Sequence, residues 1–421
     1  MSSVRDSLTG GALDGTLRSL YGDGFLLQRE KYLALLDRFK REFGLCDEAA
    51  LFSAPGRSEI GGNHTDHQLG RVLAAAVTMD TRAAAAPRSD NAVCIRSKGY
   101  PPLRLSLDRL DPRPGETNGS TALVRGIAER LRTDGWKIGG FDACIESDVP
   151  KGSGLSSSAA FSILICTIFS GLFNEGEIPP VEQALASKYA ENVHFGKPSG
   201  LMDQLASAVG GFVAIDFADP EKPEIERVEC DLAANGYAVC IVNAGGSHAN
   251  LTPEYAAIPA EMGEVARRFG KQFLRQVDEA EFYAALPKLR GAVPDRALLR
   301  AMHFFAENER VPKQVRALKE GDMEAFRLLM NESGRSSFEY LQNVCPSDPN
   351  ERGLALALAV SERMLKGEGA WRVHGGGFAG TIQALVPLKR VAAYSEEIER
   401  VFGAGSCYRF AVRPAGGVQL K

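Results

Sequence analysis

The stretch Gly56-Arg-Ser-Glu-Ile-Gly-Gly-Asn-His-Thr-Asp-His67 gathers an arginine, two histidines and two acidic residues around a pair of glycines. It directly follows a short apolar run at 50–54 and a proline at position 55. Glycine lets the backbone turn sharply, so several polar side chains of this stretch can converge on one small polar ligand: Arg57, Asn63, His64 and Asp66. This segment is therefore the first candidate for a functional site.

The composition is that of a globular protein without a strong charge. The chain has 421 residues, of which 44% are hydrophobic and 24% charged, and its formal net charge is −4. This length favours two domains, and the small net charge gives no support to a nucleic acid or an anionic membrane as partner. The longest apolar stretch, 159–173, is too short and too polar to span a bilayer, and residues 1–15 lack the apolar core of a secretory signal.

The cysteines indicate a reducing compartment. Eight of them are scattered along the chain without a Cys-x-x-Cys pair, and several lie inside apolar runs. Free cysteine in such a setting behaves as a small hydrophobic residue. We therefore expect reduced thiols and a cytoplasmic location.

Hydrophobic periodicity predicts a first half that mixes strands with helices and a second half that begins helical and ends in strands. The predicted helices of the first half are 25–43, 159–173 and 181–193, and its strands are 50–54, 71–86, 92–96 and 141–149. A strand at 237–243 is followed by helices at 254–269, 278–289, 295–308, 311–319 and 322–341, by strands at 371–374 and 381–386, by a helix at 388–402, and by a strand at 408–412. Acidic and proline residues at 219–223 place a domain boundary near 215–235.

A second candidate loop is Pro150-Lys-Gly-Ser-Gly-Leu-Ser-Ser-Ser-Ala-Ala160, between a predicted strand and a predicted helix. Its glycines leave backbone N–H groups free to point inward, and the N-terminus of the following helix adds a partial positive charge that suits a phosphate. The hydroxyls of Ser156, Ser157 and Ser158 could bind phosphate oxygens or Mg²⁺. The alternative is a serine that only caps a buried helix, and the number of glycines and serines makes it the weaker interpretation. The stretch is not a Walker A loop, because no Gly-Lys-Ser/Thr follows the glycines.

Two more segments contribute candidate residues. His374-Gly-Gly-Gly-Phe378 joins two predicted strands, either as a simple glycine hairpin or as backbone that approaches a ligand closely. The stretch 190–204 places Glu191 and Asp203 around a Gly/Pro turn. Apolar neighbours would desolvate Asp203 and raise its pKa, whereas a nearby Arg57 would lower it. A helix N-cap is the alternative role for Asp203.

A metal site is the main competing interpretation of the first segment. His64-Thr-Asp66-His67 has the look of a hydrolase metal cluster. Only six histidines exist in the chain, and the other four form no pair with ligand spacing. The metal hydrolase is therefore the less favoured alternative.

Together these segments resemble the galactokinases, a branch of the GHMP small-molecule kinases. The stretch from Gly56 to Asp66 is similar to the sugar signature of that family, 150–160 to its phosphate loop, and 375–380 to its third motif. Between them, Glu191 and 198–204 resemble the segment that holds the family's metal-binding glutamate and catalytic aspartate. The likeness runs from about residue 36 to 390.

This resemblance implies an α+β protein with the two-domain GHMP kinase fold. A ribosomal-protein-S5-like domain would span 1–220 and a ferredoxin-like α+β domain 221–421, with the active site in the cleft between them. Residues 1–24 would be an extension without an assigned role. The implied cofactors are ATP and Mg²⁺, the implied partner is a small-molecule sugar, and we expect a monomer or a weak oligomer.

The resemblance also implies a reaction, the ATP-dependent phosphorylation of the C1 hydroxyl of galactose. Asp203 would be the base and Arg57 would stabilise the transition state. The implied sugar contacts are Asn63, His64, Asp66, Gly200 and Tyr255. The implied nucleotide contacts are Gly152, Ser153, Gly154, Leu155, Ser156, Ser157 and Ser158, and the implied Mg²⁺ contacts are Ser158 and Glu191.

Three positions depart from the family pattern. The family usually has Asn where this chain has Glu59, Glu where it has Asn63, and Tyr where it has His67. The family's glutamate contacts the far hydroxyl end of the sugar, and a neutral Asn63 would tolerate a carboxylate there better. A 1-kinase for a uronic acid, an N-acetyl sugar or another aldose is therefore an open alternative. A catalytically silent sensor of sugar and ATP is a further one, although the phosphate loop is unbroken.

Overall fold

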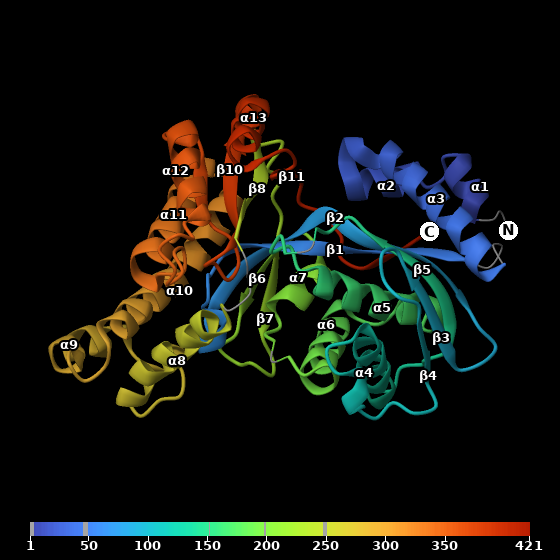
Figure 1. The fold of residues 1–421 in the computed structure, drawn as a ribbon, viewed down its shortest axis with the longest axis horizontal. Helices are drawn as coiled ribbons and strands as arrows, with labels where there is room; N and C mark the ends of the chain where they lie inside the picture. The colour runs from blue at the N-terminus through green and yellow to red at the C-terminus, as the bar shows by residue number, and fades with distance from the viewer. Residues whose placement is uncertain (1–3, 45–48, 151, 198, 247–250) are drawn as a thin grey trace.

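The structure is a computed structural model that describes residues 4–44, 49–150, 152–197, 199–246 and 251–421. Two β-sheets organise this described part of the chain (Figure 1). The larger sheet has eight strands in the described residues, with the order β12-β1-β2-β5-β3-β4; β6 also pairs with β2, and β7 pairs with β6. The smaller sheet has four, in the order β11-β8-β10-β9. Neighbouring strands pair antiparallel, apart from the parallel pair β3 and β5.

The strands are β1 Ala50–Gly61, β2 Arg71–Pro87, β3 Ala92–Ser97, β4 Leu103–Ser106, β5 Phe141–Ser147, β6 Phe212–Asp216, β7 Glu224–Val228, β8 Tyr237–Gly245, β9 Ala370–Val373, β10 Gly380–Pro387, β11 Cys407–Phe410 and β12 Val418–Leu420. The α-helices are α1 Val4–Thr9, α2 Asp14–Tyr21, α3 Phe25–Phe43, α4 Ser120–Thr133, α5 Ser157–Phe173, α6 Pro180–Tyr189, α7 Met202–Val209, α8 Thr252–Arg268, α9 Glu279–Leu289, α10 Asp295–Glu320, α11 Met323–Ser336, α12 Gly353–Leu365 and α13 Val391–Phe402.

Strand β1 carries the first half of the candidate segment. The sequence predicts a strand over 50–54 and a loop from 56, but β1 continues to Gly61 and pairs with β2 throughout. Its register shifts between Pro55 and Arg57 and again between Glu59 and Gly61. The strand is buried along almost its whole length, so the alternation that marks a half-exposed strand is missing. Bulges of this kind re-aim side chains next to functional sites.

Helices cover both faces of the larger sheet. Leu51 packs in the cluster formed by the N-terminal helices, whereas its neighbour Phe52 packs in the cluster that contains α4 to α7. Successive strand residues point to opposite faces, so the two clusters are separate cores. Figure 1 shows α1, α2 and α3 on one side of β1 and β2 and α4, α5 and α6 on the other.

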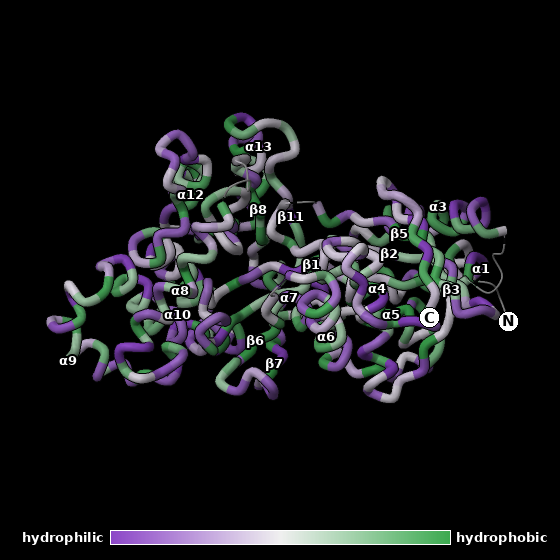
Figure 2. Tube along the Cα trace, turned by 60° about the horizontal axis from the view of Figure 1, so that its bottom comes forward, coloured by the Kyte–Doolittle hydropathy of each residue, from purple (hydrophilic) through white to green (hydrophobic). Residues whose placement is uncertain are grey.

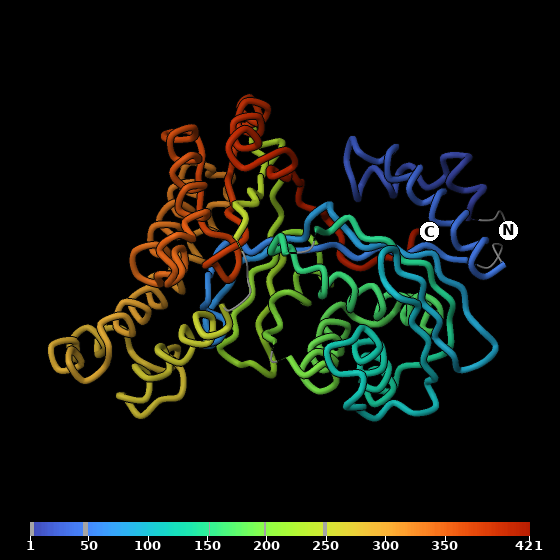
Figure 3. Tube along the Cα trace, in the orientation of Figure 1, coloured from blue at the N-terminus to red at the C-terminus, as the bar shows by residue number. Residues whose placement is uncertain are grey.

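The N-terminal extension is an integral layer of the fold. Its α1 and α2 bury leucines against α3 and the sheet. The Tyr21 hydroxyl donates to Asp80 Oδ2 at 2.5 Å, and Arg413 Nη1 lies 3.2 Å from the same oxygen, with both charged side chains fully buried. The C-terminal tail that carries Arg413 runs back from the smaller sheet toward these helices (Figure 3).

The predicted helices differ from the observed ones at several points, and α4 and α12 were not predicted from the sequence. The predicted helices 295–308 and 311–319 form the single helix α10, which accommodates Pro312. The predicted helix 322–341 divides into α11 and the π-helical turn η6, Ser337–Leu341, and 181–193 divides into α6 and the π-helical turn η4, Ala190–Phe195. These π-turns are only five and six residues long, too short for apolar periodicity to distinguish them from the α-helices that they continue. The alternation of hydrophilic and hydrophobic residues along outer helices such as α9 can be followed in Figure 2.

The predicted boundary at residue 220 stays a prediction. Strand β7 follows it in sequence and pairs with β6 of the larger sheet, and β12 returns to β1 at the end of the chain. In the described part of the chain, no helix is long and apolar enough to cross a membrane.

Candidate active site

A cavity of about 300 Å³ lies between the phosphate loop at 150–160, helix α7 and the three consecutive glycines 375–377, here called the glycine triplet. Residues from all four candidate segments line it, namely Arg57, Pro150, Gly152, Ser153, Gly154, Ser156, Ser157, Ser158, Lys197, Asp203, Tyr255, His374, Gly376, Gly377, Ala379, Gly380 and Thr381. The predicted site residues Leu155, Asn63, His64, Asp66, Gly200 and Glu191 are not part of its wall. The cavity therefore unites the predicted catalytic pair with the phosphate loop.

Arg57 and Asp203 form an ion pair at this cavity. Arg57 Nε donates to Asp203 Oδ1 at 2.7 Å, and Arg57 Nη1 donates to the Gly154 carbonyl. Ser156 Oγ donates to the other carboxylate oxygen of Asp203, also at 2.7 Å. The arginine therefore holds the aspartate and the phosphate loop in fixed positions relative to each other.

The pKa of Asp203 reflects these contacts. Burial raises the pKa of this carboxyl, but the Arg57 charge, the hydrogen bonds from Arg57 and Ser156, and the more distant Lys197 together bring it below its ordinary value. Asp203 is therefore a carboxylate at neutral pH.

The phosphate loop turns at residues with positive φ. Gly152 and Gly154 have φ of 72° and 71°, and Ser156 has φ of 55° just before α5 begins. Ser156 stands at the N-cap position but makes no capping hydrogen bond, because its hydroxyl is directed to Asp203 instead. The simple capping role is therefore not what this serine performs.

A chain of hydrogen bonds ties the phosphate loop to the glycine triplet. The Thr381 hydroxyl donates its proton to the Ser153 carbonyl at 3.1 Å. Its oxygen must therefore accept the hydrogen bond from His374, which places the ring proton on Nδ1. The other ring nitrogen, Nε2, then accepts a hydrogen bond from the Ser58 hydroxyl. Burial lowers the pKa of His374 to about 3, helped by the charge of Arg57. A Cβ at Gly154 would lie 2.8 Å from His374 Nδ1, so only glycine allows this approach.

The predicted sugar-contacting residues lie beside the cavity. A Cβ at Gly200 would be 2.9 Å from Asp66 Oδ2, so the chain turn and the Asp66 carboxylate nearly touch. His64 Nε2 donates to the Gly376 carbonyl at 3.0 Å, and burial lowers the pKa of His64 to about 3. The Tyr255 hydroxyl donates to the Gly377 carbonyl at 2.9 Å. Asn250, which precedes Tyr255 by five residues in the sequence, lies outside the described residues.

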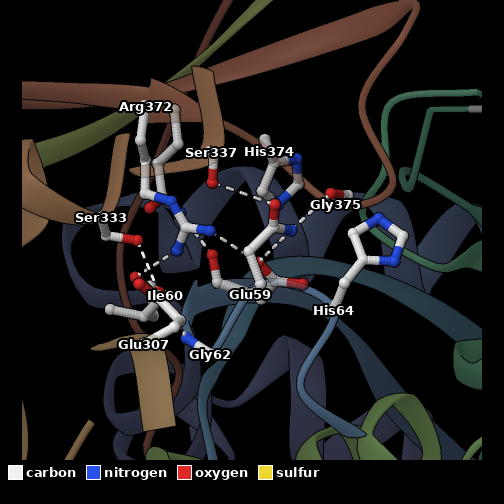
Figure 4. Close-up of polar contacts among 12 residues, drawn as sticks. Glu59, Ile60, Gly62, His64, Glu307, Ser333, Ser337, Arg372, His374 and Gly375 are labelled. Atoms are coloured by element: carbon white, nitrogen blue, oxygen red, sulfur yellow. Dashed lines mark hydrogen bonds and ion pairs between the residues drawn. The ribbon is translucent and has the colours of Figure 1, made fainter. Parts of the chain in front are cut away.

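Asn63 has a different setting from the other predicted sugar contacts. Its side chain is fully buried, and its amide donates to Glu59 at 2.9 Å and to the Gly375 carbonyl at 2.8 Å. Glu59 in turn pairs with the fully buried Arg372 at 2.7 Å. Figure 4 shows the Arg372 side chain extending from the upper left toward Glu59, with Gly375 to the right of both.

Three functional neighbours were not predicted from the sequence. Lys197 lines the cavity and lies in the segment 190–204, so its position there was a usable signal. His303 Nε2 donates to the Asn63 carbonyl at 2.9 Å, and Glu307 accepts from the Gly62 N–H at 3.0 Å. Both belong to α10 and carry no motif, so only the tertiary structure reveals them.

The metal hydrolase alternative finds no supporting cluster. Within the described ranges, no group of three or more His, Cys, Asp or Glu side chains could hold a metal ion. His64 Nδ1 instead accepts a hydrogen bond from His67 Nε2 at 2.9 Å. The two histidines are therefore partners of each other.

Sequence comparison identifies relatives of the chain. Residues 37–87 match the galactokinase galactose-binding signature, and residues 122–211 match the N-terminal domain of GHMP kinases. A galactokinase of Streptomyces coelicolor is 31% identical over 87% of this chain and 92% of its own length. A galactokinase of Lactococcus lactis is 30% identical over 88% of this chain and 91% of its own length.

Comparison of structures agrees with these matches. The crystal structure of Lactococcus lactis galactokinase complexed with galactose has a TM-score of 0.78 and 28% identity, and it covers 92% of this chain and 99% of its own. A mevalonate kinase structure matches with a TM-score of 0.62 at 16% identity, over 86% of this chain and 99% of its own, which indicates the fold alone. The predicted GHMP kinase fold is confirmed, and by sequence and by structure the chain belongs to the galactokinase family.

Proposed function

We propose that this protein transfers the γ-phosphoryl group of ATP to the C1 hydroxyl of galactose. The observation that carries the proposal is the contact of Asp203 with Arg57 and Ser156 at a cavity lined by the phosphate loop. Family membership supports the reaction, and the relatives that are named galactokinases support galactose over other aldoses.

The chemistry assigned to the pair is a proton transfer coupled to phosphoryl transfer. The Asp203 carboxylate accepts the proton of the C1 hydroxyl, the sugar oxygen forms a bond to the γ-phosphorus, and the bond from that phosphorus to the β-bridging oxygen breaks to leave ADP. Arg57 faces the charge that spreads over the transferred group. Phosphoryl transfer depends mainly on such positioning and charge stabilisation.

The rest of the cavity wall favours a polyanion. Arg57 and Lys197 bring positive charge, and the N-terminus of α5 adds about half a charge more. His374 is neutral, so its ring orders the loops and leaves the charge balance to the other groups. The only carboxylate in the described wall is Asp203, the proposed base.

The donor set also fits Mg²⁺, which accompanies ATP in phosphoryl transfer. Mg²⁺ prefers oxygen ligands, and Ser158 supplies a hydroxyl at the cavity wall. The buried Glu191 carboxylate accepts a hydrogen bond from Gln204 through Oε2 at 3.1 Å, and this is the contact that orients it. When bound, Mg²⁺ neutralises part of the phosphate charge, and we propose Ser158 and Glu191 as its protein contacts.

We propose Asp66, His64, Gly200 and Tyr255 as the residues that surround the sugar, because His64 and Tyr255 donate to the Gly376 and Gly377 carbonyls of the cavity wall and Gly200 lies against Asp66. The seven cysteines that the structure describes are free thiols, which supports a cytoplasmic location, while Cys46 lies outside the described residues. A monomer or weak oligomer stays a prediction.

The decisive experiment compares wild type with Asp203→Asn in a galactose-dependent ADP-release assay, with ³¹P NMR of the product. Wild type is expected to form a 1-phosphate, and the variant to lose about 10²- to 10⁴-fold in kcat, the usual contribution of a general base. Binding of galactose, measured by calorimetry, should change little. The matched control is Asp111→Asn, at an exposed aspartate that is distant from Asp203 in the sequence. Full activity of Asp203→Asn would refute the mechanism, and absence of a sugar phosphate from wild type would refute the function.

A further inference from the structure

The side chain of Asn63 has every hydrogen-bonding capacity occupied by protein groups. Its Nδ2 donates to Glu59 Oε1 and to the Gly375 carbonyl, as described above. Its Oδ1 accepts from Ser337 Oγ at 3.1 Å and from Asn343 Nδ2 at 2.9 Å. A primary amide has two donors and two acceptor sites. Nothing is left on this buried side chain to recognise a substrate hydroxyl.

These partners fix the orientation of the amide. Two acceptors, Glu59 Oε1 and the Gly375 carbonyl, face its nitrogen, and two donors, from Ser337 and Asn343, face its oxygen. A rotated amide would oppose acceptor to acceptor and donor to donor, at a cost of four hydrogen bonds. The site therefore requires both a donor and an acceptor at position 63, which a carboxylate cannot supply.

The carboxylate of this cluster is provided by Glu59. Arg372 donates to Glu59 Oε1 at 2.7 Å through Nη2 and to the Ile60 carbonyl at 2.6 Å through Nη1. Burial raises the pKa of Glu59, although Arg372 acts against that shift. Figure 4 shows Arg372 between Glu59 and Ile60, with Ser337 and Gly375 on the other side of the cluster. Glu59 is thus balanced by Arg372, and the neighbouring buried Glu307 by Arg310, so a further acid at position 63 would have no cation of its own.

The contact with Gly375 belongs to a wider arrangement of the glycine triplet. The Gly375 carbonyl accepts from Asn63, the Gly376 carbonyl from His64 and Asn343, and the Gly377 carbonyl from Tyr255. Gly376 and Gly377 form part of the cavity wall. Carbonyl oxygens that faced a phosphate would repel it, so side-chain donors that engage all of them set the triplet in an orientation suited to an anion.

We propose that Asn63 is a positioning residue for the glycine triplet, and that its amide, together with Glu59 and Arg372, acts through the Gly375 carbonyl on the phosphate side of the cavity. The inference rests on the proposed function and changes the role predicted for Asn63 from a sugar contact to a structural partner of the loop. It also makes the pair Glu59 and Asn63 a unit in which the acid and the amide have complementary roles.

The test is Asn63→Asp, which has the same shape but no donor. At pH 8 its carboxylate faces Glu59 and the Gly375 carbonyl, so the loop loses its fixed orientation, and we expect kcat to fall about tenfold or more, as for the loss of one buried hydrogen bond, with the KM for galactose little changed. Two carboxyls at this distance share a proton. Activity and melting temperature of the variant relative to wild type should therefore recover as the pH is lowered from 8 to 6.

A double variant that compensates for the lost amide provides the second part of the test. Glu59→Gln/Asn63→Asp moves the amide to position 59 and restores one donor between the two side chains, so it should be more active than Asn63→Asp, and Glu59→Gln alone is the matched control. Other titratable groups around the pair of Glu59 and Asn63 are Arg372, Arg57, Asp66, His64, His303 and Glu307, and wild type measured at each pH accounts for them.

Two results would overturn the inference. One is an Asn63→Asp variant with wild-type kcat and a raised KM for galactose, which would make Asn63 a sugar contact. The other is a double variant as defective as Asn63→Asp, with pH profiles parallel to wild type; this arm decides even where Asn63→Asp alone does not fold. Wild-type turnover of galactose is measured first, so failure of the proposed function is distinguished from failure of this inference.

Discussion

The two ends of the segment 56–67 differ in how their polar groups are used. At one end, Arg57 binds Asp203, whose side chain is 32% exposed at the cavity and able to meet a substrate. At the other end, Asn63 is fully buried and its amide is saturated by protein groups. Both ends are densely polar in the sequence, and only the first faces the cavity.

This difference separates reaction from support. A polar group that keeps an accessible atom can exchange its contacts with a ligand, whereas a buried and fully bonded one stabilises a single arrangement of the backbone. Changes at the Arg57 end should therefore act directly on turnover, whereas changes at the Asn63 end should act on stability and reach turnover only through the geometry of the glycine triplet.

The largest effect that would test this division is expected from Arg57→Met. The variant removes the charge that faces the transferred group and the partner of Asp203, so kcat should fall about 10²- to 10³-fold, as for other groups that stabilise transition-state charge. Arg57→Lys should recover only part of the loss, because lysine cannot reach two acceptors as a planar fork. ADP-release kinetics would measure both. Arg316→Met, at an exposed arginine on α10, is the control, and a variant at position 57 that matched it would contradict the assignment.

A smaller effect on turnover is expected from Lys197→Met. Lys197 lines the cavity and helps lower the pKa of Asp203, but it is exposed, so solvent screens its charge. We expect kcat to fall about tenfold at low salt, equivalent to about 1.4 kcal/mol, and Lys197→Arg to retain most of the activity. The difference should shrink at 0.5 M salt. Equal salt dependence of wild type and Lys197→Met would show that this charge does not act on the phosphates, and Lys313→Met provides the background value.

A change at the buried end should affect stability more than turnover. Ser337→Ala removes one of the two donors to Asn63 Oδ1 and leaves the other, from Asn343, in place. The free energy of unfolding should fall by about 1 kcal/mol, the net value of one such hydrogen bond, and kcat should stay within about threefold. Urea unfolding and steady-state kinetics on the same preparation would measure both. A large loss of kcat without loss of stability would place this end in the reaction itself.

The sequence predicted the reaction side of the site better than the supporting side. Arg57, Asp203 and the phosphate loop belong to contiguous motifs whose chemistry depends on residue type and spacing, and the structure brings them to one cavity. The partners of the buried end are His303 and Glu307 of α10 and Arg372 of β9, far from it in the chain. Long-range contacts of this kind follow from tertiary packing and carry no local pattern.

The fold shows the same limit. Helix α3 was predicted with its observed bounds, because an apolar stripe ends at Gly44 in the left-handed conformation that glycine favours. The first half of the signature was predicted as a loop on account of its glycines, but pairing with β2 makes it a strand. Local propensity is a weak guide where both neighbours of a strand are supplied by the rest of the chain.

The smallest expected effect concerns His374, which joins the two loops. Its pKa is about 3 in the folded protein and ordinarily near 6.5 in an unfolded chain. As the pH falls below 6.5, the unfolded chain takes up a proton that the folded protein does not, so the free energy of unfolding decreases with decreasing pH. Between pH 7 and 6 this histidine should account for about 0.7 kcal/mol of the loss. Urea unfolding of wild type and of the non-titrating His374→Gln at both pH values would measure it: the variant should lose about that much less than wild type. Equal losses would mean that His374 also takes up a proton in the folded state. A protonated ring could not accept the hydrogen bond from Ser58, which links strand β1 to the glycine triplet.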